Sequence, residues 1–143
     1  MAAAAETGPV AKQIQYVNLG SVRDVALAQR ALDLALTDAA PVPLRPGIIR
    51  AVAGQHPAMA FDWAVAHEAQ IQTLLESTTR NSFIVGLAQG SGDVAVAQRV
   101  KAYAARAIPE GSRKPADTAV GVIEYRAALR ARQAAALAKW AGS

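Results

Sequence analysis

The sequence has no cysteine, only two histidines and few aromatic residues. Without cysteine, the chain of 143 residues can form neither a disulfide scaffold nor a thiolate metal site. Its 10 glycines and 7 prolines follow no period, and its hydrophobic content is 52%, which argues against collagen-like and disordered chains. No stretch of about 18–20 residues is free of charged or helix-breaking residues, so we expect no membrane-spanning helix.

Alanine dominates what is present. The sequence holds 35 alanines, about a quarter of the chain. Alanine is the best helix former, and its small side chain lets helix axes approach closely. A chain of this length also fits one domain. We therefore expect residues 1–143 to form a single all-α domain with closely packed helices.

Proline, glycine and capping residues divide the chain into about seven helices. We expect Ser21 to be the N-cap of the second helix, and Ser91 or Asp93 that of the sixth. Short connectors predict stacked helical hairpins in an irregular α-α superhelix of the HEAT or armadillo kind, although no clean repeat of 33 to 47 residues is visible. The expected helices cover residues 10–19, 21–38, 48–53, 57–75, 83–88, 93–107 and 117–140.

Basic residues are concentrated in the second half of the chain. The formal net charge is +4. From Arg113 to the end there are six basic residues against two acidic ones, Asp117 and Glu124. A basic C-terminal helix can bind an acidic partner, nucleic acid or a carboxylate ligand, or it can simply be solvated. Because no aromatic residues alternate with the arginines as a stacking platform, nucleic acid is disfavoured.

The residues needed for catalysis are missing. His67 and Glu68 begin like the zinc-binding HExxH pattern, but the position of the second histidine is occupied by Ile71. There is no GxSxG nucleophile elbow, and the turn at 90–92 lacks the Gly-Lys-Ser/Thr of a phosphate loop. We therefore predict no catalytic residue, no metal ligand and no cofactor in this chain, and we do not expect it to be an enzyme by itself.

One small group of side chains remains as a candidate binding site. Arg126 and Arg130 are four residues apart on the last predicted helix, next to Tyr125. Two guanidinium groups on one helix face can hold a carboxylate by paired hydrogen bonds. The residues alone favour the alternative of a solvated surface pair near Glu124.

The order of several segments resembles the C-terminal domain of zinc aminopeptidases of the aminopeptidase N, puromycin-sensitive and endoplasmic-reticulum types. LGSVRDVALAQRALDLAL (19–36) is similar to a helix pair of that domain, and SFIVGLAQGSGDVAVAQRVKAY (82–103) to a later pair. Between them, residues 42–67 contain Ala-Phe-Asp-Trp, in which the two aromatics are exchanged relative to the family's helix. The last helix, from residue 119, resembles the family's terminal helix ending in Trp-Leu, here Trp140-Ala141.

This resemblance covers nearly the whole chain in the right order. It implies an α-helical superhelix that packs over a thermolysin-like catalytic domain and encloses the peptide substrate. The partners would be the catalytic domain of the same polypeptide and the peptide, with neither nucleic acid nor membrane. Zinc, its ligands and the general base would lie in that upstream domain, so this chain would be an excised C-terminal piece. Tyr125, Arg126 and Arg130 are then candidates for the carboxylate end of a bound peptide.

The alternative is an independent helical-repeat module that binds an acidic partner through its basic last helix. The excess of 11 arginines over 4 lysines, with abundant alanine, suggests a GC-rich bacterial genome. Cytoplasm and periplasm are both compatible with the absence of cysteine, so the sequence leaves the compartment open.

Overall fold

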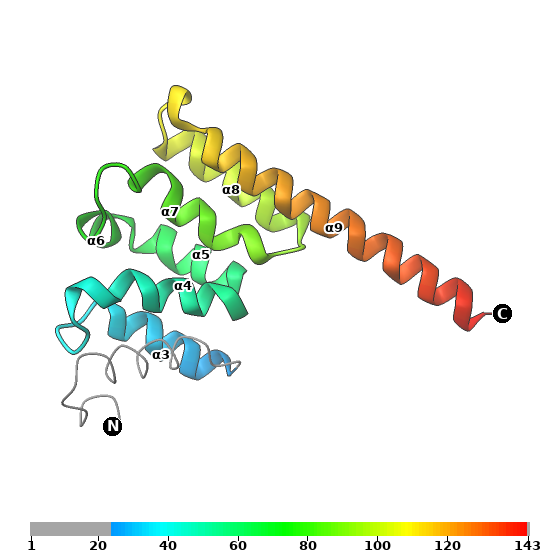
Figure 1. Ribbon diagram of the computed structural model, residues 1–143, viewed down its shortest axis with the longest axis horizontal. Coiled ribbons are helices and arrows are strands. Elements are labelled where there is room, and N and C mark those ends of the chain that lie inside the picture. The colour runs from blue at the N-terminus through cyan, green and yellow to red at the C-terminus, as the bar shows by residue number, and fades with distance from the viewer. Residues whose placement is uncertain (1–23, 143) are drawn as a thin grey trace. The chain divides into compact units, whose positions relative to one another are not determined.

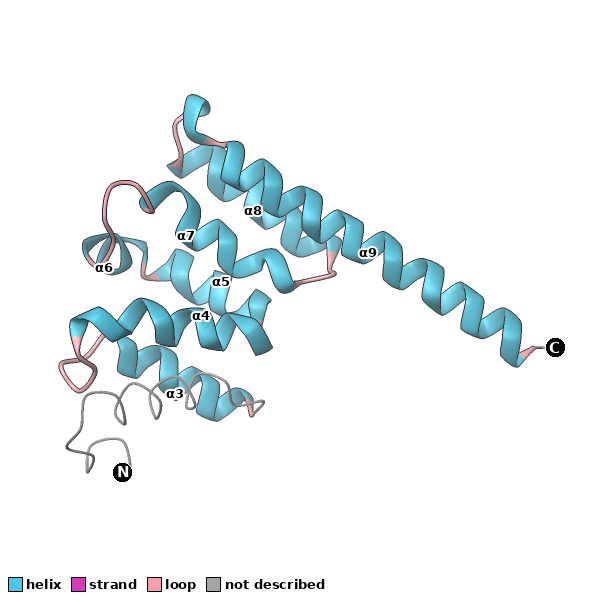
Figure 2. Cartoon of the chain, in the orientation of Figure 1, coloured by secondary structure: helices cyan, strands magenta, loops and turns pink. Residues whose placement is uncertain are grey.

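The structure, a computed structural model, describes residues 24–142 (Figure 1). This part of the chain is helical throughout, with short turns and no strand (Figure 2), which confirms the predicted all-α class. The expected helix at 10–19 lies outside the described residues. The α-helices are α3 (Val25–Ala35), α4 (Arg45–Gln55), α5 (Pro57–Ala66), α6 (Glu68–Thr73), α7 (Arg80–Leu87), α8 (Val94–Ala107) and α9 (Lys114–Ala141). Three short 3₁₀ helices are η1 (Val42–Leu44), η2 (Ala88–Gly90) and η3 (Glu110–Ser112).

The chain divides into two compact units, residues 1–80 and 81–143. In the first unit, α3 packs on α4 and α4 packs on α5. Alanine makes this close packing possible, because small residues stand beside the large ones in the core. The fully buried side chains of these three helices include Ala28, Leu32, Ala35, Ile49, Val52, Ala60 and Ala64.

The N-cap of α3 is Asp24, whose carboxylate accepts a hydrogen bond from the backbone N–H of Leu27 over 3.1 Å. Ser21, the N-cap predicted from the sequence, lies outside the described residues. A carboxylate satisfies an otherwise unpaired N–H and also interacts favourably with the helix dipole.

The long helix predicted for 57–75 is interrupted at His67. The backbone of His67 leaves the helical region, with φ −114° and ψ 26°, so α5 ends and α6 begins at this residue. Its ring stacks on Trp63 with centroids 4.7 Å apart, and its Nδ1 lies 2.8 Å from the Trp63 carbonyl oxygen. The apolar pattern continues through the break, since Phe61 and Ile71 are both buried. The apolar periodicity of the sequence therefore does not indicate the break at His67.

In the second unit, α9 packs on α8 and on η2. Val96, Val100 and Ala104 of α8 are buried, as are Ala119 and Ile123 of α9. Asp93 caps α8 by accepting from the N–H of Ala95 over 2.9 Å. Ser91 in turn accepts from the N–H of Asp93 over 3.1 Å. The sequence offered these two residues as alternative N-caps, and Asp93 is the N-cap.

Each of three helix-to-helix connectors is stabilised by an arginine side chain that makes the same kind of hydrogen bond. In each, Nε donates to the carbonyl five residues earlier: Arg45 to Ala40 over 2.9 Å, Arg80 to Leu75 over 3.4 Å, and Arg113 to Ile108 over 2.9 Å. The residues that supply these carbonyls are all buried. The arginines are 35 and 33 residues apart, so this contact recurs at a spacing typical of helical-hairpin repeats.

Candidate functional site

The three predicted site residues all lie on α9, and all three are exposed. Tyr125 is 62% exposed. The buried residues of α9 occupy the opposite side of the helix and belong to its first ten residues: Ala116, Ala119, Val120 and Ile123. With 3.6 residues per turn, this arrangement turns Tyr125 away from α8.

A shallow, open depression of about 470 Å³ on the outer face of α9 joins two of these residues, and we call it the groove. It is lined by Thr118, Gly121, Val122, Tyr125, Arg126 and Leu129, all from α9. Glycine at position 121 contributes no side chain to this surface, one turn before Tyr125. The groove therefore combines a phenol, a guanidinium and an apolar wall.

The third residue, Arg130, is placed differently. Its guanidinium covers the backbone of Gly92, where an added Cβ would lie 2.8 Å from the guanidinium carbon. Arg130 is not among the residues that line the groove. A paired grip by Arg126 and Arg130, as predicted from their spacing, would need the Arg130 side chain to swing away from Gly92.

The nearest acidic residue on α9 has its own partner. Glu124 forms an ion pair with Lys101 of α8, with Oε1 and Nζ 3.1 Å apart. From Tyr125 to Gly142 the helix has four basic residues, Arg126, Arg130, Arg132 and Lys139, and no acidic one. Arg126 is the only charged residue that lines the groove, and the helix beyond it carries only positive charge, which favours an anionic ligand at this end of the groove.

The described residues 24–142 contain no group of three or more histidine, cysteine or acidic side chains placed to hold a metal ion. His67 stacks on Trp63, and the Trp63 indole N–H donates to Asp33 over 3.3 Å. The Asp33 carboxylate also accepts from the Gln29 amide over 3.2 Å. This cluster ties α3 to α5, and it could not be predicted because its members are 30 residues apart in the sequence.

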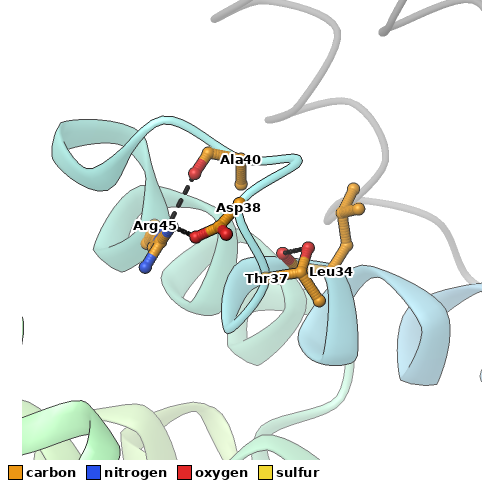
Figure 3. Close-up of polar contacts among 5 residues, drawn as sticks. All are labelled: Leu34, Thr37, Asp38, Ala40 and Arg45. Carbon is orange, nitrogen blue, oxygen red and sulfur yellow. Dashed lines mark hydrogen bonds and ion pairs between the residues drawn. The ribbon is translucent and has the colours of Figure 1, made fainter.

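A second pocket, in the first unit, was not predicted from the sequence. It has a volume of about 360 Å³ and is lined by Leu36, Arg45, Ala69, Gln70, Thr73 and Leu74. The Arg45 side chain is only 14% exposed. It lies between the Ala40 carbonyl and Asp38, whose carboxylate is 3.7 Å away and fully exposed (Figure 3). These contacts hold the turn after α3, where the Thr37 hydroxyl also donates to Leu34 over 2.8 Å.

Comparisons with known proteins found no matching family model, no matching curated protein and no matching solved structure. Among the helices of residues 24–142, none is long and apolar enough to cross a membrane.

Proposed function

We propose that this chain is the non-catalytic C-terminal domain of a zinc aminopeptidase, which caps the catalytic domain and encloses the peptide. The main support is the order of four sequence segments, which resemble that domain along nearly the whole chain. The helical fold of residues 24–142 is compatible with the superhelix that this resemblance implies. Zinc and the catalytic residues would belong to the catalytic domain.

At the level of residues, we propose that the groove on α9 binds the far end of the peptide. Arg126 would pair with the carboxylate at the far end of a peptide, and the Tyr125 hydroxyl would donate a second hydrogen bond. Leu129 and Val122 would contact an apolar side chain of the same peptide. Since Arg126 is exposed in this chain, water weakens the pairing, and enclosure by the catalytic domain would strengthen it.

The test is the binding of a peptide to the full chain, followed by backbone NMR shifts along α9. A ten-residue peptide ending in leucine with a free carboxylate should shift the amides around Tyr125 and Arg126. The same peptide with an amidated end should do so much less, because it lacks the charge. Arg126→Ala should reduce the response, whereas Arg132→Ala, which removes the same charge two turns later, should leave it nearly unchanged.

Equal responses to the free and amidated peptides would refute carboxylate recognition. So would equal losses for Arg126→Ala and Arg132→Ala, because that result would indicate a general effect of positive charge rather than a site.

The second candidate is an independent helical module that binds an acidic partner. The observation that favours it is the exposure of every residue of α9 from 128 onward. The two candidates differ in the part of α9 that they use: the groove at 118–129 for the peptide, and the C-terminal half of the helix for a protein partner.

A further inference from the structure

The C-terminal half of α9 extends beyond the helix that supports it. Figure 1 shows α9 continuing past the start of α8. The contact of Arg130 with Gly92 lies at that level, because Gly92 comes just before the N-cap of α8. All fifteen residues from 128 to 142 are exposed, and we call them the distal segment. Its last eleven helical residues span about 16 Å at 1.5 Å per residue.

The composition of the distal segment favours a helix in spite of this exposure. Six of the eleven residues from 131 to 141 are alanine, the best helix former. Lys139 lies in the last turn, where a positive charge interacts favourably with the helix dipole. The backbone of the segment is therefore helical before any partner binds.

The distal segment has an apolar face with basic edges. Leu129, Leu137 and Trp140 follow one another at i, i+8 and i+11, which places them on the same side of a helix. They are 37%, 66% and 79% exposed. At 3.6 residues per turn, Arg130 borders this face on one edge, and Arg132 and Lys139 border it on the other. No acidic residue occurs in the segment.

We propose that the distal segment is a docking helix for an acidic protein partner, whose helix presents apolar residues flanked by glutamate or aspartate. Carboxylates along one side of the partner's apolar strip would pair with Arg132 and Lys139. Arg130 marks the other edge, but its guanidinium covers Gly92, so it is not counted as a pairing group. The alanines between the larger side chains let a second helix approach closely. Exposed ion pairs add little each, so the two together mainly set the orientation and speed of binding.

Other occupants fit the distal segment less well. Two copies of the segment would bring three positive charges against three, with no carboxylate between them. A lipid surface gains mainly from large apolar side chains, and this face has only three among many alanines. Nucleic acid is disfavoured because its bases stack on aromatic side chains, and Trp140 is the single aromatic residue of the segment.

The test uses the full chain and a labelled 21-residue peptide of three Leu-Ala-Glu-Leu-Glu-Ala-Glu repeats, measured by fluorescence anisotropy. We expect saturable binding that weakens between about 0.05 M and 0.5 M salt. Arg132→Glu should weaken it about fivefold. Leu137→Ala, which keeps the charge, should also weaken it. Lys114→Glu is the matched control, because it reverses one exposed charge at the other end of α9 and should have little effect.

Several outcomes would overturn this proposal. One is an equal loss for Arg132→Glu and Lys114→Glu, and another is undiminished binding of a scrambled peptide with the same charge. A third is tighter binding to vesicles of phosphatidylcholine with a quarter phosphatidylglycerol, or to a DNA duplex, than to the peptide. Circular dichroism of each variant separates lost binding from lost helix. Leu129 belongs to both the groove and the distal segment, but Arg126 lies outside the segment. Arg126→Ala should therefore leave binding of the acidic peptide nearly unchanged even if the aminopeptidase proposal fails.

Discussion

At the scale of single residues, arginine side chains stabilise the connectors between helices by donating hydrogen bonds to backbone carbonyls. Arg113 is the clearest case, because its Nε donates to both Ala104 and Ile108 and its terminal nitrogen donates to Ala105 over 3.2 Å. These carbonyls lie in the last turn of α8 and at its C-cap, where a helix leaves most carbonyls without an internal partner. The Ala104 carbonyl also accepts from the backbone N–H of Ile108 over 3.0 Å. Three of the eleven arginines thus hold connectors, which leaves fewer of them for ligands than the composition suggests.

Replacing Arg113 should destabilise the second unit. We expect Arg113→Ala to lower the free energy of unfolding by about 1–3 kcal/mol, since three backbone acceptors lose a charged donor. Arg113→Lys should recover only part of this, because lysine lacks the planar guanidinium that reaches several acceptors. Urea unfolding followed by circular dichroism measures the difference. Lys114→Ala, at the neighbouring exposed position, is the control, and an equal loss there would contradict the assignment.

At the scale of elements, sequence patterns located the helices better than they located the breaks. The predicted helix at 93–107 agrees closely with α8, because a capping aspartate precedes it and an amphipathic pattern fills it. The predicted helix at 48–53 is too short, since α4 already begins at Arg45, directly after the turn held by that arginine. The break at His67 was missed because stacking on Trp63 leaves no trace in the apolar periodicity.

Removing the end of α9 tests how independent its two halves are. Deletion of residues 131–143 should change the free energy of unfolding by no more than about 0.5 kcal/mol, because the deleted helical residues are exposed. The same deletion should abolish binding of the acidic helical peptide. A deletion starting at the buried Ile123 is the contrasting variant and should destabilise the unit strongly. A large loss of stability from the shorter deletion would show that the distal segment packs on the rest of the protein.

At the scale of the whole molecule, charge is divided as unevenly as the sequence suggested. Residues 24–80 have six acidic and four basic side chains, whereas residues 81–142 have four acidic and nine basic ones. The two compact units that the fold defines, 1–80 and 81–143, therefore differ in sign over the described residues. Whether they act as a single domain, as predicted, stays a prediction.

The chain by itself should neither bind zinc nor cleave aminoacyl-naphthylamides. The reason is the missing second histidine after His67, whose place is taken by the buried Ile71. Elemental analysis after zinc loading and dialysis, with a zinc aminopeptidase as positive control, measures this. Stoichiometric zinc that His67→Ala removes would contradict the assignment and would point to a metal site completed by residues outside 24–142.

The candidate site could be predicted only in part. Tyr125 and Arg126 line one groove, as their adjacency on a helix allowed, whereas Arg130 lies over Gly92. Helical spacing predicts which side of a helix a residue occupies, but not where a long flexible side chain comes to rest. The pocket beside Arg45 was missed because its walls come from α4, α6 and the end of α3.

The sequence by itself determined the helical class, because alanine content and capping residues act locally and need no partner. It also determined the charge of the last helix. Only the tertiary structure decided which part of that helix is covered. Four residues of its first ten, Ala116, Ala119, Val120 and Ile123, are buried, whereas Leu137 and Trp140 remain exposed beyond the start of α8. The physical reason is length: α9 has 28 residues and its supporting helix α8 has 14, so half of α9 has no helix beside it in its own unit.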